Sequence, residues 1–299
     1  MRQSERTTRG SHMVRYCRRL AVVALAMATM SIGLTGTTAQ AGTGHHGSHH
    51  GSSHATGWYV ALGDSLAAGY QPNAGDDKTG GYVGAVLAAE KRTARKTKLR
   101  NLACSGETST TLVDGGRCDY VKGNQLDQAL AFMRAHRRTT SLVTMTIGAN
   151  DVTPCLRATD QNACIQERLA VLGANLHTSL AKIHAAAPDA RIVVTNYYNP
   201  YLALYFTNPA LAQQTSGLQM ALNSTIATVT APYGTTVDVA SAFQSYDTTV
   251  VGGVPTNVSR ICTLTWMCSL NDIHANDDGY ALIGATVAAA LPRARGHRH

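Results

Sequence analysis

Beyond residue 57, short runs rich in β-branched residues alternate with longer stretches whose apolar residues recur at the helical period. Runs of the first kind predict buried strands, and stretches of the second kind predict helices with one buried face. The predicted strands cover residues 59–62, 99–103, 142–147, 191–195 and 236–239. The predicted helices cover residues 82–91, 125–136, 165–187, 210–231 and 277–290. A strand followed by a helix, repeated, favours a parallel sheet covered on both faces and joined by right-handed crossovers.

Length and composition limit the number of domains without deciding it. The chain has 299 residues, which suit one large α/β domain or two smaller ones. With 44% hydrophobic and 15% charged residues, most of the chain is expected to be globular. We predict one domain over residues 58–292, followed by a short basic tail over residues 293–299.

The N-terminal segment has the features of a secretory signal. Residues 15–19 include three Arg, residues 20–34 form an apolar run, and residues 39–41 read Ala-Gln-Ala, a small-residue cleavage pattern. A membrane anchor is the alternative, but the apolar run is short and contains Thr29, Ser31 and Gly33. We therefore predict a signal peptide over residues 1–41, and a secreted, extracellular mature protein without a membrane span.

Residues 42–57 consist mainly of Gly, Ser, Thr and His, with five His among them. A segment of this composition has little apolar surface to bury, so we expect a flexible linker. Its imidazoles can also capture transition-metal ions. We favour a spacer with incidental metal affinity, and we expect the protein to need neither a metal nor another cofactor.

The charge balance argues against nucleic acid as a partner. The net charge is +8, but the predicted leader contains six Arg and one Glu, so its removal leaves +3. No basic stripe interleaved with aromatic residues is present in the mature sequence. We expect a monomer whose partner is a small molecule or a lipid.

Seven Cys are present, and Cys17 leaves with the leader. An even number of Cys in an exported chain favours disulfides. Six Cys allow 15 pairings, and none of their spacings is typical of a zinc site. We choose the sequence-local pairs, Cys104–Cys118, Cys155–Cys164 and Cys262–Cys268.

Polar turns that contain Gly follow the first three predicted strands. They are Gly63-Asp64-Ser65, Ser105-Gly106-Glu107 and residues 148–151 (Gly-Ala-Asn-Asp). The carboxyl ends of parallel strands lie at one edge of a sheet, where ligand sites form. A Ser nucleophile needs a base and preformed oxyanion donors, which these turns and a later His can supply. Taken alone, Gly-Asp-Ser is also typical of a helix cap.

Four blocks in order resemble the SGNH (GDSL) family of serine esterases and lipases, in its secreted bacterial, actinomycete-like form. They are Gly63-Asp64-Ser65-Leu66, Gly106, Gly148-Ala149-Asn150-Asp151 and the C-terminal His274. The resemblance implies a three-layer, flavodoxin-like α/β/α domain that hydrolyses carboxylic esters through an acyl-enzyme. It implies Ser65 as nucleophile and His274 as general base. It also implies an oxyanion hole formed by the N–H groups of Ser65 and Gly106 and the side-chain amide of Asn150.

One position departs from the family pattern. An orienting Asp often lies three residues before the His, and here that residue is Asn271. Asp272, two residues before His274, is the nearest carboxylate and the candidate for a third catalytic member. A backbone carbonyl that orients His274 is an equal alternative. We expect Asp64 and Asp151 to act as caps and loop braces.

The substrate is the least constrained feature. Residues 197–206 are unusually aromatic, and they suit the wall of an acyl pocket or a packed loop equally well. We favour acyl lipid esters. A carbohydrate acetyl esterase with the same catalytic residues is the alternative, and a non-catalytic secreted binding module is a further one.

Overall fold

A computed structural model describes residues 57–291. The predicted signal peptide, the predicted tail and all but the last residue of the predicted linker lie outside the described residues. Five parallel strands form the central sheet in the order β4-β1-β5-β6-β7. They are β1 (Trp58–Gly63), β4 (Lys98–Asn101), β5 (Thr140–Thr146), β6 (Arg191–Thr195) and β7 (Thr235–Val237).

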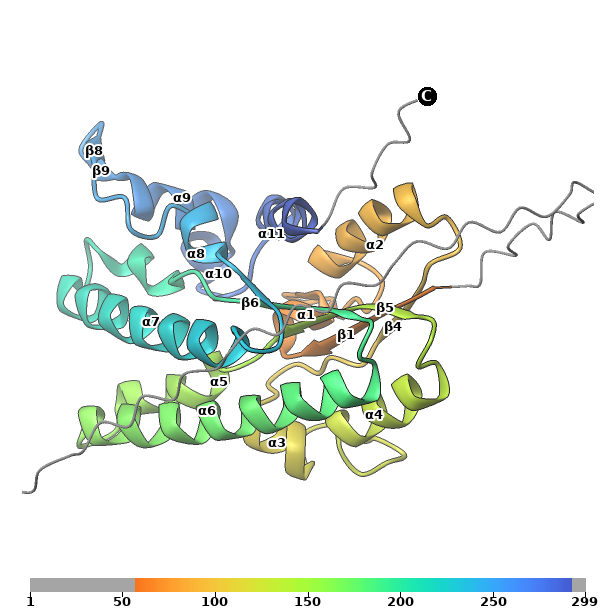
Figure 1. The fold of residues 1–299 in the computed structure, drawn as a ribbon. Helices are drawn as coiled ribbons and strands as arrows, with labels where there is room; N and C mark the ends of the chain where they lie inside the picture. The colour runs from red at the N-terminus through yellow and green to blue at the C-terminus, as the bar shows by residue number, and fades with distance from the viewer. Residues whose placement is uncertain (1–56, 292–299) are drawn as a thin grey trace, which may run out of the picture. The chain divides into compact units, whose positions relative to one another are not determined.

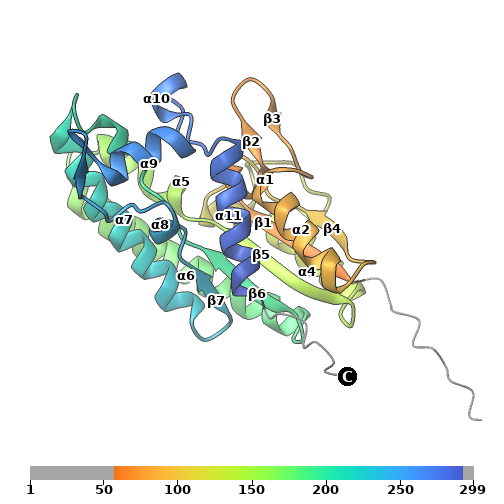
Figure 2. The same cartoon turned by 90° about the horizontal axis from the view of Figure 1, so that it is seen from above.

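The long helices lie on both faces of this sheet (Figures 1 and 2). From β1 the chain adds β4 on one side of the sheet, whereas β5, β6 and β7 are added in turn on the other side. Right-handed crossovers in these two directions place the connecting helices on opposite faces of the sheet. On one face α2 (Gly81–Thr93) packs against α11 (Asp277–Ala290). On the other face α6 (Gln161–Ala186) packs against α4 (Gln125–Ala135) and α7 (Pro209–Thr230). The predicted three-layer α/β/α fold is confirmed.

The core of the sheet explains why its strands are so apolar. Residues 59–62 of β1 are fully buried, as expected for a central strand covered by helices on both faces. Three buried Thr also point into this core, and tyrosine or threonine hydroxyls bond to each of them. The bonds are Tyr59–Thr144 at 2.8 Å, Tyr82–Thr146 at 2.8 Å and Thr146–Thr195 at 2.7 Å between side-chain oxygens. Each of these five hydroxyls therefore has a hydrogen-bond partner.

Two of the predicted strands end earlier than expected. In both, a side chain near the end of the strand accepts a backbone N–H group that would otherwise be free to continue the sheet. The strand expected over residues 99–103 stops at Asn101, whose side-chain oxygen accepts the N–H of Ala103 at 3.0 Å. The strand expected over residues 236–239 stops at Val237. Asp238 then caps a short helix by accepting the N–H of Ser241 at 3.0 Å.

Several short elements were not predicted from the sequence. The earlier ones along the chain are α1 (Ser65–Ala68), β2 (Tyr70–Gln71), β3 (Gly75–Asp76), α3 (Ser109–Asp114), α5 (Ala149–Val152) and η1 (Thr153–Arg157). The later ones are η2 (Pro200–Leu204), α8 (Val239–Ala242), β8 (Val250–Val251), β9 (Val254–Pro255), α9 (Thr256–Leu264) and α10 (Met267–Leu270). Most have five residues or fewer, which is too short to show a hydrophobic period.

Three disulfides join Cys104 to Cys118, Cys155 to Cys164 and Cys262 to Cys268. These are the sequence-local pairs expected above. Among the helices between residues 57 and 291, none is both long and apolar enough to cross a membrane.

Candidate active site

Ser65 lies where β1 turns into α1, at the carboxyl edge of the sheet. Gly63 makes this turn with φ of 119°, and a Cβ there would lie 1.9 Å from the carbonyl oxygen of Thr146. Only glycine tolerates both this conformation and this close approach. Asp64 caps the new helix by accepting the N–H of Leu66 at 3.0 Å. Ser65 thus becomes the first residue of α1, with its hydroxyl facing the edge of the sheet.

His274 contacts this hydroxyl from the other end of the chain. Its Nε2 is 2.8 Å from Ser65 Oγ, although 209 residues separate the two in sequence. The loop that carries His274 is fixed by a hydrogen bond from the N–H of Trp266 to the His274 carbonyl, at 3.0 Å. The ring of Tyr70 packs against the imidazole, with 4.4 Å between ring centroids. The structure therefore brings the two sequence-predicted residues together on a supported loop.

Asp272 occupies the opposite side of the imidazole. Its Oδ1 is 2.6 Å from His274 Nδ1 and also accepts the backbone N–H of His274 at 2.9 Å. Of the two alternatives left open by the sequence, this geometry corresponds to the carboxylate and not to a backbone carbonyl. Asn271 adopts a left-handed conformation with φ of 52° at the end of α10 and makes no hydrogen bond to His274 within residues 57–291.

Asn150 and Gly106, two of the expected oxyanion donors, differ in their position relative to the cavity. Asn150 lines the same cavity as Ser65, and its Nδ2 donates to the carbonyl of Glu107 at 2.9 Å. Because an amide has two N–H bonds, the second remains for a ligand. Gly106 adopts φ of 80° in the loop after β4 and is not among the residues that line this cavity. Within residues 57–291, the N–H groups of Ser65 and Gly106 donate to no protein group.

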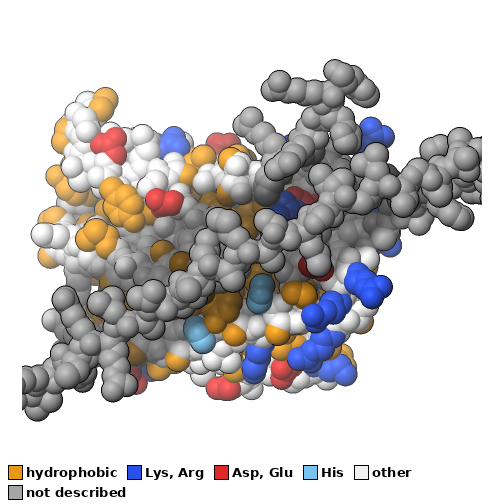
Figure 3. Space-filling model, in the orientation of Figure 1, with side chains coloured by type: hydrophobic (Ala, Val, Ile, Leu, Met, Phe, Trp, Pro, Cys, Tyr) orange, Lys and Arg blue, Asp and Glu red, His pale blue; other side chains and the backbone are white. Residues whose placement is uncertain are grey.

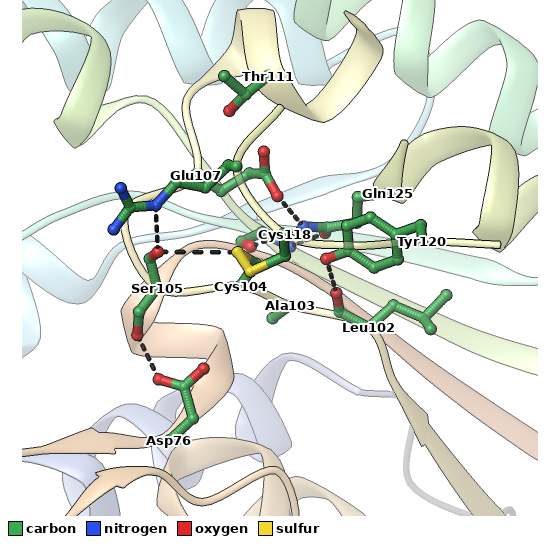
Figure 4. Close-up of a disulfide and its surroundings, with 12 residues drawn as sticks. Asp76, Leu102, Ala103, Cys104, Ser105, Glu107, Thr111, Cys118, Tyr120 and Gln125 are labelled. Atoms are coloured by element: carbon green, nitrogen blue, oxygen red, sulfur yellow. Dashed lines mark hydrogen bonds between the residues drawn. A yellow bond between two sulfur atoms is a disulfide. The ribbon is translucent and has the colours of Figure 1, made fainter. Parts of the chain in front are cut away.

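A buried glutamine connects the Ser65 turn to the Gly106 loop. Gln125 Oε1 accepts the N–H of Gly63 at 2.6 Å, and its Nε2 donates to the Gly63 carbonyl at 3.1 Å and to Glu107 Oε2 at 2.8 Å. Figure 4 shows this contact beside the Cys104–Cys118 disulfide. Burial raises the pKa of the Glu107 carboxyl. One residue thus fixes the two backbone segments that carry the candidate oxyanion donors.

Side chains also bind the carbonyl groups of the Gly106 loop. Tyr120 Oη donates to the Leu102 carbonyl at 2.6 Å, and Arg117 Nε donates to the Ser105 carbonyl at 2.8 Å. Figure 4 shows the bond of Tyr120 to Leu102 near the disulfide. The guanidinium of Arg117 lies against Gly106, where a Cβ would come within 2.3 Å of it. The loop is therefore fixed by several contacts, and a larger residue at Gly106 would displace Arg117.

Two further carboxylates, those of Asp151 and Asp64, brace the site as predicted. Asp151 accepts the N–H of Ser109 at 2.9 Å and its hydroxyl at 2.5 Å, which attaches α3 to α5. Asp64 is buried and accepts the hydroxyl of Tyr197 as well as its capping bond. Burial raises the pKa of Asp64 to about 7, although the hydrogen bonds from Tyr197 and Leu66 lower it. Burial also raises the pKa of Asp151.

A cavity of about 690 Å³, including the open space at its mouth, extends from Ser65 and His274. Most of its walls are apolar: Leu66, Val152, Leu156, Tyr197, Tyr198, Pro200, Tyr201, Leu218, Leu222 and Ile273. The aromatic segment over residues 197–206 is divided. Its first part, to Tyr201, lines the cavity, whereas Tyr205 and Phe206 are exposed. The first part of this segment lies where an acyl-pocket wall was predicted, Leu202 is packed in the interior, and neither interpretation describes the exposed end.

Sequence reasoning missed Gln125, Tyr70 and the role of Tyr197 beside Asp64. Gln125 begins a predicted helix and Tyr70 follows a turn, so no spacing or motif separates them from ordinary surface residues. The aromatic segment did single out Tyr197, but not its contact with Asp64, 133 residues away. Within residues 57–291, no group of three or more His, Cys, Asp or Glu side chains is arranged to hold a metal ion.

The α/β/α fold and a cavity that opens at a Ser–His pair suit a hydrolase. Residues 61–282 match the GDSL-like lipase/acylhydrolase family, so the chain belongs to that family and to the class of carboxylic ester hydrolases. None of the curated proteins compared with the chain matches it.

Solved structures agree on the fold. An extracellular lipase from Streptomyces rimosus is 22% identical, with a TM-score of 0.54 over 79% of this chain and 100% of that one. A lipase from a goat rumen metagenome is 18% identical, with a TM-score of 0.52 over 78% and 97%. A GDSL-like lipase from Parabacteroides merdae is 15% identical, with a TM-score of 0.51 over 77% and 93%.

Proposed function

We propose that this ester hydrolase uses Ser65 as its nucleophile and His274 as its base, and that it cleaves acyl lipid esters outside the cell. The observation that carries the proposal is the continuous contact of Asp272, His274 and Ser65, at 2.6 Å and 2.8 Å. A serine hydroxyl is a weak nucleophile until a neighbouring base accepts its proton. An imidazole in contact with a carboxylate on one side and the hydroxyl on the other supplies that base.

In the first step, Ser65 Oγ forms a bond to the acyl carbon while its proton moves to His274 Nε2. The tetrahedral intermediate then expels the alcohol, which takes the proton from His274 as the carbon–oxygen bond breaks. In the second step, His274 accepts a proton from water, the resulting hydroxide attacks the acyl carbon, and the acid leaves Ser65 as its oxygen regains the proton. Asp272 keeps Nδ1 protonated and compensates the positive charge of the imidazolium.

The negative oxygen of the intermediate requires donors that do not depend on pH. The N–H groups of Ser65 and Gly106 and the second N–H of Asn150 Nδ2 are the candidates. They belong to three separate turns, and the Gln125 contacts and the Cys104–Cys118 disulfide hold two of these turns. Donors held in advance stabilise the transition state without reorganisation.

The cavity supports an acyl chain as the group bound beside Ser65. Its walls are mostly aliphatic and aromatic. Each buried methylene contributes about 0.8 kcal/mol. We therefore expect KM to fall about fourfold per added methylene until the chain fills the cavity. An acetyl group would leave most of this apolar surface unused, which disfavours the carbohydrate acetyl esterase.

Export and processing belong to the same proposal. The charged, apolar and small-residue pattern over residues 1–41 supports a signal peptide, with residues 42–57 as the linker to the catalytic domain. The three disulfides of the domain also suit an oxidising compartment. We propose a monomeric mature enzyme without a cofactor.

The test is a rate series on p-nitrophenyl esters from acetyl to palmitoyl, with Ser65→Ala compared with Ser259→Ala as a matched control. Ser259 is an exposed serine on α9. We expect Ser65→Ala to lose turnover and the burst of nitrophenol, Ser259→Ala to retain both, and kcat/KM to rise with chain length. A Ser65→Ala enzyme with unchanged turnover would refute the mechanism, and a maximum at acetyl would favour the carbohydrate esterase.

A further inference from the structure

Four large apolar side chains are exposed on two segments that both adjoin α9: Tyr205 (42%), Phe206 (62%), Val250 (61%) and Val251 (69%). We call them the apolar rim. Val250 and Val251 form a strand of two residues, joined to β9 by Gly252-Gly253. A hairpin this short has no second layer to cover its side chains. Such exposed apolar groups on a soluble domain mark a surface that meets something else.

The rim is continuous with the mouth of the catalytic cavity. Pro200 and Tyr201 of η2 line the cavity, and Tyr205 directly follows that helix. Tyr205 and Phe206 contact each other edge to face, with 4.9 Å between ring centroids. Helix α9 packs against both η2 and β9, so one helix supports the two segments that carry the rim. Figure 1 shows the hairpin beyond α9, at one end of the described domain.

The stretch of chain that carries the rim has very little charge. Residues 192–271 include η2, α7, the β8–β9 hairpin, α9 and α10, yet only three of these 80 residues are charged, compared with 15% of the whole chain. They are Asp238, Asp247 and Arg260. Figure 3 shows hydrophobic side chains at the end that carries the hairpin, while most Lys and Arg side chains on this face lie at the opposite end. Arg260 is the single cation of this stretch, and Arg157 of η1 is the cation outside it that acts on Tyr201, so an anionic surface would find few cations to bind here.

We propose that the apolar rim binds the surface of an uncharged or zwitterionic lipid aggregate, such as a phosphatidylcholine bilayer, and holds the cavity mouth against it. Apolar side chains that enter the headgroup region bind in proportion to the area they bury. An acyl chain can then pass into the cavity without crossing open water. The proposal rests on the proposed function, because it concerns how a lipid ester reaches Ser65.

The test measures flotation of the Ser65→Ala protein with phosphatidylcholine vesicles, so that the lipid is not consumed. In that protein we compare Phe206→Asp and the double change Val250→Asp with Val251→Asp. The control is Val121→Asp, because Val121 is 93% exposed and lies between Cys118 and α4, away from the rim. We expect binding to weaken about tenfold or more in the rim variants, since each change removes apolar area and adds a charge. The control and 1 M NaCl should leave binding unchanged.

The same substitutions in the Ser65 enzyme separate this proposal from the proposed function. Hydrolysis of soluble p-nitrophenyl butyrate should stay within about twofold of wild type in the rim variants, because none of these residues lines the cavity. If the wild-type protein does not hydrolyse soluble p-nitrophenyl butyrate, the proposed function is refuted. If the wild-type protein hydrolyses the soluble ester but the rim variants bind vesicles as well as the control variant does, the rim proposal alone is overturned. Binding that requires anionic lipid, or self-association through the rim without vesicle binding, would overturn it as well.

Discussion

Replacement of Asp272 by Asn tests the mechanism most directly, because it preserves the shape of the site and removes one charge. Asp272 Oδ1 accepts two hydrogen bonds from His274, one from the ring and one from the backbone. The side chain of Asp272 is 25% exposed and that of His274 is 16% exposed, so this pair is neither fully buried nor freely solvated. An effective dielectric constant of about 20 suits such a position.

The magnitude follows from the charge separation in the transition state. With charge centres about 4 Å apart, a carboxylate stabilises an imidazolium by roughly 4 kcal/mol at that dielectric constant. Partial exposure makes this an upper value, because water screens the pair. Each 1.36 kcal/mol corresponds to a factor of about ten in rate, so we expect kcat to fall about 10²- to 10³-fold. KM should change little, since the charge on the imidazole develops only during the reaction.

The assay is steady-state hydrolysis of p-nitrophenyl butyrate, with the thermal midpoint of unfolding measured for each variant. The matched control is Asp278→Asn, which removes an equal charge from an exposed position in the first turn of α11. The control should retain wild-type kcat. The reasoning is wrong if Asp272→Asn keeps more than about a third of the wild-type kcat, or if the loss is matched by a comparable fall in the unfolding midpoint.

Three further predictions concern the supports of the site. Asn150→Ala should lower kcat for p-nitrophenyl butyrate about 10²-fold or more while KM stays similar, because one oxyanion donor is lost; an unchanged kcat would remove Asn150 from the oxyanion hole. The pKa of Asp64 is raised to about 7 in the folded protein, so the folded state holds the proton more tightly than the unfolded state does. Stability from this group is therefore present below about pH 4 and is lost as pH rises toward 7, by roughly 4 kcal/mol at most. Urea unfolding at pH 5 and pH 7.5 should show a smaller decrease in Asp64→Asn than in wild type, and equal decreases would contradict the assignment. Replacing Cys104 and Cys118 together by Ala opens a loop with a sequence separation of 14 and should cost about 3 kcal/mol of unfolding free energy. The same change should lower kcat at temperatures where the protein stays folded, because Gly106 lies in that loop; unchanged kcat would show that the other contacts suffice.

The sheet and the long helices could be predicted because their signals are local. Residues 59–62 and 142–147 are nearly continuous apolar runs, which suit strands buried on both faces. The helix predicted over residues 277–290 has the same bounds in the structure, where Asn276 caps its first turn. The ends of shorter elements were less predictable. Val239 leaves the last strand because the side chain of Asp238 bonds to the backbone of α8, a competition that residue preference does not reveal.

The candidate site was likewise predictable from the sequence only in part. The sequence by itself determined that Ser65 and Asn150 follow strands β1 and β5, whose carboxyl ends lie at one edge of a parallel sheet. It did not determine which group faces His274 Nδ1, because a carboxylate two residues away reaches the ring only in certain loop conformations. The pairing of Thr265 with Ala275 and the bond from Trp266 to the His274 carbonyl set that conformation.

Only the tertiary structure decided how distant residues combine. Gln125 meets Gly63 across 62 positions, and Tyr197 meets Asp64 across 133. The same is true of the aromatic segment, whose first residues enter the cavity while Tyr205 and Phe206 remain exposed. A sequence specifies periodicity, turns and caps through neighbours a few residues apart. Side-chain direction at a site depends instead on the packing of elements that meet only when the whole sheet has formed.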